Sequence, residues 1–346
     1  MKTIRIKFVD FYEHFVPENF LFYKTLAEHY KIELSDTPDY LFFSVFGNEH
    51  LKFDCVKIFW TGENQTPDFN VCDYAVGFDY LNFDDRYLRF PLYYTYKEDY
   101  DLMLGKTYFQ EDTLFSKTGF CSFVYSNNYA SPERKEFFDL LSAYKLIASG
   151  GRYLNNTDGA VVDKLAFQKG YKFAIAFENA SYPGYATEKL VQAFAAQSIP
   201  IYWGDPKIAE QFNTGSFINC HDFASFTDVI KRVKQIDNDD AAYLQMLQTP
   251  ALVNAENEYE NAMSALSAFL ENIVEQPLRN AKRYNREYWG RKYIKKELQL
   301  QKAYNRSLRG LAEKMYMKYF KKIEKNNKSV VLWRFHKILM RLFNKN

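Results

Sequence analysis

Cysteine is scarce in this sequence, and the few cysteines are not arranged to bind a metal. The chain has four cysteines among its 346 residues, and no two of them form a Cys-x-x-Cys pair. This spacing excludes a disulfide-rich scaffold and a zinc ribbon. The five histidines are also scattered along the chain. The sequence therefore predicts neither a disulfide framework nor a metal site.

Long apolar runs are missing as well. No stretch approaches the roughly 20 apolar residues that a membrane-spanning helix requires. The N-terminal segment MKTIRIKFVDFY alternates apolar and polar side chains and includes Asp10. Such alternation is typical of a β-strand and not of a signal peptide. We expect a protein that is made and kept in a reducing cytoplasm.

Charge is distributed unevenly. The formal net charge is +2, but residues 277–346 contain 21 lysines and arginines and only 4 acidic residues. The rest of the chain is therefore acidic, so the two parts are expected to have different surroundings. This composition predicts a basic helical tail over 277–346.

Within the tail, apolar and basic residues fall on separate faces of a predicted helix. The apolar residues recur every three or four positions, at Val331, Phe335, Ile338 and Leu342. The cations lie off that face, at Arg334, Lys337, Arg341 and Lys345. This pattern is typical of a helix that lies on an anionic membrane surface. The alternative is that the helix packs on the acidic part of the chain, whereas the apolar stripe disfavours nucleic-acid binding.

The first half of the chain alternates strand-like and helix-like segments, as α/β proteins do. Strands are predicted over Thr3–Val9, Tyr40–Phe46, Val56–Thr61 and Tyr74–Gly77. Helices are predicted over Phe20–Tyr30 and Glu133–Ala148, and a long loop over 95–118. A hinge at Ser149-Gly150-Gly151 would divide the chain into domains 1–150 and 151–276, followed by the tail.

The clearest local unit is a strand, loop, helix and strand between residues 173 and 203. Phe173–Phe177 is a compact apolar strand, and Thr187 can cap a helix that runs to about Gln197. The next strand is Ile199–Trp203. In such units, ligands bind where strands end and helices begin.

Polar side chains gather at this point of the sequence, at Glu178, Asn179, Tyr185, Glu188 and Lys189. A helix N-terminus and a lysine suit a diphosphate, and a glutamate can accept hydrogen bonds from ribose hydroxyls. The alternative is that Glu188 only offsets the helix dipole and Lys189 is solvated. Arg152, which follows the Gly-Gly pair, is a candidate phosphate clamp or else an ordinary exposed arginine.

A further candidate is Glu63, which lies just past the predicted strand that ends with Trp60 and Thr61. A carboxylate there can act as a general base, or it can be an ordinary turn residue. Two Asp-x-Asp triplets, at 99–101 and 237–239, lie in polar stretches away from strand ends. We interpret them as solvated loop charges, so no metal site is expected.

Taken together, these motifs resemble glycosyltransferase family 10, the bacterial α-1,3/4-fucosyltransferases. The resemblance rests on FAIAFENASYPGYATEKLVQAFAAQSIPIYWGDP over 173–206, FWTGENQTPDFNVCDYAVGFDYLNFDDRYLRFPLYY over 59–94 and FVYSNNYASPERKEFFDLL over 123–141. The matches follow the order of the family and cover roughly residues 50–225. Their co-occurrence is much more specific than any one of them.

The resemblance implies a GT-B fold, in which two Rossmann-like domains face a cleft. It implies that Glu63 is the general base, that Arg152 and Lys189 neutralise the diphosphate of GDP-fucose, and that Glu178, Asn179, Tyr185 and Glu188 bind the donor. The implied reaction is an inverting transfer of fucose that needs no metal cofactor. The implied acceptor is N-acetylglucosamine or glucose of a β-galactoside, with a Lewis-x-like α-1,3 product.

Two alternatives remain open at this stage. One is a GT-B transferase that uses another nucleotide sugar. The other is a membrane-associated sugar-binding protein without activity. The implied location is the bacterial cytoplasm, peripheral on the inner face of the membrane.

Overall fold

The computed structural model describes residues 1–105, 117–126, 128–284, 287–307 and 310–311. The chain forms two compact units, residues 1–284 and 285–346. In the second unit, α11 (Glu287–Arg306) is a basic helix that buries Ile294. The predicted membrane-facing stripe from Val331 to Leu342 lies outside the described residues. Among the helices that the structure describes, none is long and apolar enough to cross a membrane.

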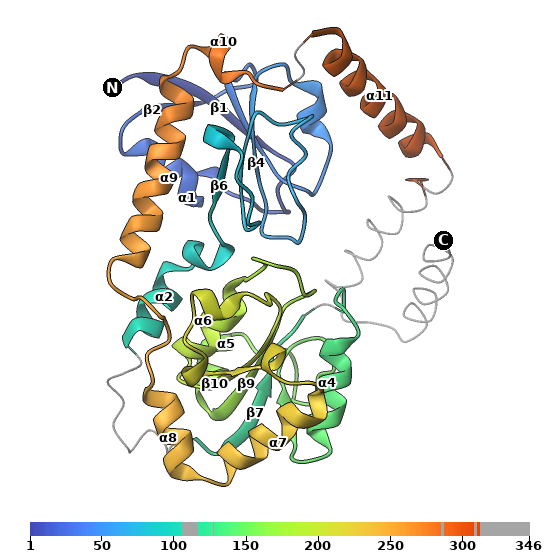
Figure 1. The fold of residues 1–346 in the computed structure, drawn as a ribbon. Helices are drawn as coiled ribbons and strands as arrows, with labels where there is room; N and C mark the ends of the chain where they lie inside the picture. Colours follow the sequence, from blue (N-terminus) through green and yellow to red (C-terminus); the bar gives the residue numbers. More distant parts are fainter. Residues whose placement is uncertain (106–116, 127, 285–286, 308–309, 312–346) are drawn as a thin grey trace. The chain divides into compact units, whose positions relative to one another are not determined.

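Six parallel strands form the first sheet, in the order β2-β1-β3-β4-β5-β6 (Figure 1). The strands are β1 (Thr3–Val9), β2 (Lys31–Leu34), β3 (Tyr40–Phe43), β4 (Val56–Trp60), β5 (Tyr74–Gly77) and β6 (Tyr87–Arg89). Every residue of β3, β4 and β5 is buried, as expected for central strands of a parallel sheet with both faces covered. The predictions for β1 and β5 are confirmed, and β3 and β4 are shorter than predicted.

Five strands form the second sheet, in the order β11-β10-β9-β7-β8. They are β7 (Gly119–Phe123), β8 (Ile147–Ser149), β9 (Tyr171–Phe177), β10 (Ile199–Trp203) and β11 (Ile218–Asn219). Because β7 and β8 belong to this sheet, it begins before the division that the sequence placed at residue 150.

Close packing, and not a hinge, explains the Gly150-Gly151 pair. A Cβ atom added at Gly151 would lie 2.0 Å from the backbone oxygen of Tyr125. The Gly150 N–H donates to the Phe123 carbonyl at 3.0 Å. The glycines therefore let the chain after β8 pack against the chain after β7.

The helices are α1 (Leu21–Ala27), α2 (Lys97–Leu104), α4 (Glu133–Ser142), α5 (Lys164–Lys169), α6 (Glu188–Ala195), α7 (Phe226–Asp237), α8 (Asp240–Gln248), α9 (Glu258–Glu275) and α10 (Leu278–Ala281), besides α11. The helix predicted to end at Ala148 ends at Ser142, because the chain must turn before β8. The loop predicted over 95–118 contains α2, which buries Tyr100 and Met103.

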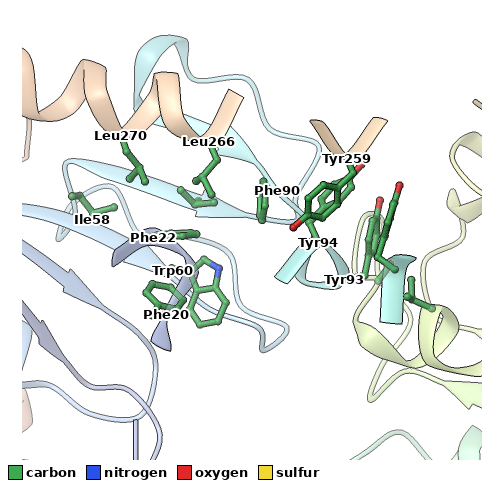
Figure 2. Packing of buried hydrophobic residues seen from close by; sticks show 14 of the residues in the cluster. Phe20, Phe22, Ile58, Trp60, Phe90, Tyr93, Tyr94, Tyr259, Leu266 and Leu270 are labelled. Carbon is green, nitrogen blue, oxygen red and sulfur yellow. The ribbon is translucent and has the colours of Figure 1, made fainter. Parts of the chain in front are cut away.

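After the second sheet, the chain returns to the first. Helix α9 packs against α1 and β6. Its Leu266 and Leu270 join the buried cluster that contains Phe22 and Ile58 (Figure 2). The buried Asp73 then accepts the backbone N–H of Tyr284 at 2.7 Å and holds the end of this unit on the first sheet. The helices that cover the first sheet thus come from two separate parts of the sequence.

Candidate active site

A cavity of about 400 Å³ lies where strands from both sheets end. It is lined by residues that follow β4, β7 and β9 and by the N-terminus of α6. Parallel strands present their carboxyl ends at one edge of a sheet, which explains why these loops meet. The cavity brings together five of the predicted site residues, which are Glu63, Asn179, Tyr185, Glu188 and Lys189.

The predicted base, Glu63, lies on a tight turn after β4. Its backbone N–H donates to the Thr61 hydroxyl at 3.0 Å, and its carbonyl accepts the N–H of Gln65 at 2.8 Å. A Ser/Thr side chain commonly stabilises such a turn. At Gly62, a Cβ atom would lie 2.9 Å from the Leu92 side chain, so glycine permits close contact there. The turn places an exposed carboxylate in the cavity wall.

Glu178 stabilises the start of α6 by accepting hydrogen bonds from it. It is fully buried and accepts hydrogen bonds from the Thr187 N–H at 2.7 Å, the Thr187 hydroxyl at 2.6 Å and the Lys189 Nζ at 2.9 Å. Thr187 is the N-cap residue as predicted, but its hydroxyl bonds Glu178 and not the helix. Glu178 does not line the cavity. Its contacts make it a residue that positions Lys189.

The charges on α6 are stabilised by their neighbours. Burial disfavours the charged form of Lys189, but Glu178 and Glu188 outweigh burial and raise its pKa above the ordinary value. Burial likewise disfavours the Glu188 carboxylate, but Lys189 and Lys164 lower its pKa. The Lys189 Nζ lies 3.5 Å from the Glu188 carboxylate. Both shifts favour the charged forms, so a bound anion does not need to recruit the lysine proton.

Arg134 lines the cavity although the sequence did not single it out. It is buried in the first turn of α4, and its guanidinium lies 4.1 Å from the ring centroid of Tyr125. Its Nη2 donates to the Asn179 side chain at 2.7 Å and to the Phe177 carbonyl at 3.2 Å. No partner of its buried Nε is seen in the part of the chain that the structure describes. A guanidinium held this rigidly suits an oxygen-rich anion such as a diphosphate.

Lys164, in the first turn of α5, is a second cation of the cavity that sequence reasoning missed. Its Nζ donates to the Gln192 side chain at 2.7 Å, and Gln192 in turn donates to Asp99 at 2.9 Å. Burial lowers the pKa of Lys164, and the nearby Glu188 opposes that effect. A lysine at the start of a short helix gives no sequence signal of its own, whereas Arg134 was part of the matched segment 123–141.

Arg152 is not brought to this cavity. It is exposed and does not belong to the cavity lining, because the Gly-Gly pair before it packs on Tyr125. Arg134, and not Arg152, lines the cavity.

The aspartate triplets also differ from expectation. Asp237 is buried, and Lys145 and Lys172 form ion pairs with it at 2.5 Å and 3.1 Å. Asp99, in α2, accepts a hydrogen bond from the Gln192 side chain of α6. Neither Asp99 nor Asp237 is therefore a solvated loop charge. Among the described residues, no group of three or more His, Cys, Asp or Glu side chains is arranged to hold a metal. The four cysteines are unpaired thiols.

Two parallel-sheet α/β halves that share a cavity at their strand ends are the architecture of GT-B glycosyltransferases. A solved α1,3-fucosyltransferase has this fold, with a TM-score of 0.69 and 31% identity over 80% of this chain and 91% of that one. The structure of an α1,3-fucosyltransferase with GDP-fucose gives a TM-score of 0.65 and 30% identity over 80% of this chain and 93% of the other.

The chain belongs to glycosyltransferase family 10, the fucosyltransferases. Residues 6–96 match the alpha-(1,3)-fucosyltransferase FucT N-terminal domain, and residues 114–269 match the C-terminal part of glycosyltransferase family 10. The two matches change over between residues 96 and 114, ahead of β7. The alpha-(1,3)-fucosyltransferase FucT of Helicobacter pylori is 35% identical over 301 residues, which are 75% of this chain and 62% of that protein. This chain thus spans about three fifths of that relative.

Proposed function

We propose that this chain transfers L-fucose from GDP-β-L-fucose to a hydroxyl of a β-galactoside glycan, with Glu63 as the general base. The observation that carries the proposal is one cavity that contains a carboxylate from the first sheet and the cations Arg134, Lys164 and Lys189 from the second. The base and the leaving-group site are thus supplied by different halves of the molecule. The similar solved α1,3-fucosyltransferases with GDP and with GDP-fucose support this donor.

The proposed step is a single displacement that inverts the anomeric carbon. Glu63 takes the proton of the acceptor hydroxyl while that oxygen forms a bond to the anomeric carbon of fucose. The bond to the β-phosphate oxygen breaks, and its electron pair leaves with GDP. The transition state resembles an oxocarbenium ion, as in other glycosyl transfers. Arg134, Lys164 and Lys189 stabilise the charge that develops on the diphosphate.

Donor recognition uses the remaining predicted residues. Asn179 is fixed by Arg134, and Tyr185 and Glu188 line the same cavity, so these three are proposed to bind the nucleotide sugar. Glu178 supports them through Lys189. Arg152, which is exposed and does not line the cavity, is not among the proposed donor contacts.

The reaction is proposed to require no metal cofactor, with a divalent ion at most stimulatory. Three cations and the N–H groups at the start of α6 surround the place of the diphosphate, and they can offset its negative charge without a bound ion.

The acceptor is proposed to be N-acetylglucosamine in N-acetyllactosamine, or the glucose of lactose, with an α-1,3 linkage and a Lewis-x-like product. The name of the Helicobacter pylori relative supports this linkage. The enzyme is proposed to act in the bacterial cytoplasm, held on the inner face of the membrane by the basic tail; the pattern of apolar and basic residues over 331–345 supports that location.

Product analysis tests the proposal directly. The purified chain is incubated with GDP-fucose and a panel of type 1 and type 2 disaccharides, and the linkage of each product is determined. Fucosylated type 2 acceptors with GDP release are expected. Turnover of a different nucleotide sugar in preference to GDP-fucose, or no turnover of any donor, would contradict the proposed activity.

A further inference from the structure

A second cavity, of about 640 Å³, adjoins the cavity that contains Glu63. Four residues line both cavities, namely Tyr12, Trp60, Leu92 and Tyr96. The other walls of the second cavity, called here the side groove, come from the 3₁₀ helix Pro17–Asn19, from α1 and from the start of α2. A molecule bound at Glu63 can therefore extend into the side groove without crossing the donor-binding α6.

The lining of the side groove combines flat apolar surfaces with dispersed polar groups. Tyr12, Val16 and Tyr96 are 54%, 47% and 37% exposed, which is high for side chains of their size. Aromatic rings provide rigid apolar area with a polar tip, which fits the apolar C–H faces and the hydroxyl edges of pyranose rings. Asn19 and Lys24 add hydrogen-bonding groups at the wall. Mixed linings of this kind are usual in small-molecule sites.

Trp60 offers a hydrogen-bond donor at the junction of the two cavities. Its side chain is held among Phe20 and Phe22, with ring centroids 4.9 Å and 6.0 Å away (Figure 2). The residue is 9% exposed, and its indole N–H makes no hydrogen bond among the residues that the structure describes, although it is not one of their enclosed unpaired polar atoms. Such an N–H is free to donate to a ligand. Since Trp60 lines both cavities, a bound hydroxyl is a suitable acceptor for this N–H.

We propose that the side groove binds the sugar units of the acceptor glycan that lie beyond the unit receiving fucose. The inference rests on the proposed function and extends it, because it makes an oligosaccharide of more than two units the preferred acceptor. Tyr12 and Tyr96 carry the ring faces, and Trp60 donates a hydrogen bond to a sugar hydroxyl at the junction of the two cavities.

The experiment compares Val16→Trp with Val253→Trp. Val16 lines the side groove and not the Glu63 cavity, so a tryptophan there fills the groove. Val253 has a similar exposure of 52% and lines neither cavity, so it is the matched control. Binding of a type 2 disaccharide and of a tetrasaccharide that extends it is measured by calorimetry in the presence of GDP. Transfer from GDP-fucose is measured with both acceptors.

Wild type and Val253→Trp are expected to bind the tetrasaccharide about tenfold more tightly than the disaccharide. This ratio is the gain expected from a few additional contacts between the glycan and the side groove. Val16→Trp is expected to lose this preference while its affinity for GDP stays within about twofold of wild type. Trp60→Phe, which keeps a ring but lacks the N–H, is expected to weaken binding of both glycans about fivefold, the effect of one hydrogen bond.

Equal binding of the two glycans by wild type, or an undiminished preference in Val16→Trp, would overturn the side-groove inference. That failure is separable from failure of the proposed function. If GDP-fucose is turned over but glycan length has no effect on binding, only the assignment of the side groove is contradicted. If the tetrasaccharide binds as expected but no fucose is transferred to any acceptor, the proposed activity is contradicted and the glycan-binding site is supported.

Discussion

Replacing Arg134 should weaken GDP binding far more than replacing Arg152, although sequence reasoning selected Arg152. Arg134 is buried in the cavity wall, where it bonds Asn179 and stacks on Tyr125. A hydrogen bond to a charged group is worth about 1.5 to 3 kcal/mol, and a tenfold change in affinity corresponds to about 1.4 kcal/mol. Arg134→Ala should therefore raise the Kd for GDP between about 10-fold and about 150-fold.

The matched comparison is Arg152→Ala. Arg152 is exposed and outside the cavity lining, so its loss should change the Kd for GDP by less than about threefold. Calorimetry with GDP gives both values, and thermal unfolding shows whether each variant is folded. Because Arg134 also contacts protein groups, Arg134→Lys is included. It keeps the charge but loses the planar fork that bonds Asn179, and should give an intermediate Kd.

The reasoning is refuted if Arg152→Ala weakens GDP binding as much as Arg134→Ala does. It is also refuted if a folded Arg134→Ala variant binds GDP like wild type. Either result would mean that the diphosphate lies elsewhere than between α4 and the start of α6.

Four further predictions concern the base, a titrating cation, metals and the tail. Glu63→Ala should reduce transfer below about 1% of wild type with GDP affinity nearly unchanged, and greater residual transfer would contradict its role as general base. Burial lowers the pKa of Lys164 from the ordinary 10.5, so its charge, and with it GDP affinity, declines as the pH rises through that lowered value. Lys164→Arg should abolish this decline because arginine does not titrate there, and identical pH profiles of the Kd for GDP would exclude Lys164 as the cause. Transfer should persist in EDTA; complete loss that added metal restores would show a required ion. A chain that ends at Lys328 should keep its activity but no longer bind anionic vesicles. If the truncated enzyme is inactive and the full chain does not bind vesicles, the tail is part of the folded enzyme and not a membrane anchor.

Much of the second half of the site could be predicted because local sequence determines it. An apolar strand, a polar loop and an amphipathic helix follow one another between Tyr171 and Ala195, and their order alone brings Asn179 near Lys189. The prediction of a carboxylate past β4 succeeded for the same reason. Parallel strands then place these chain segments at one edge without further information.

Contacts between distant segments could not be predicted in this way. Arg134 reaches the cavity only because α4 packs on β8 and α7 with Arg134 at the end of β9, and its partner Asn179 is 45 residues away in the chain. Thr187 could be identified as an N-cap from its type, but not its bond to Glu178, which depends on a carboxylate buried behind the helix. Gly151 was interpreted as flexible, since the sequence does not show the Tyr125 backbone beside it.

The return of α9 to the first sheet makes the first domain discontinuous in sequence. Leu266 and Leu270 belong to an apolar core that includes Phe22 and Ile58 from the part of the chain before residue 105. A fragment that ends near residue 105 would expose that core to water and would be expected to aggregate. The second sheet and its helices, by contrast, are one insertion between α2 and α9. Exchanging donor domains between relatives would therefore require two junctions, one after α2 and one before α9, and a single crossover would leave each hybrid with an α9 that evolved against another core.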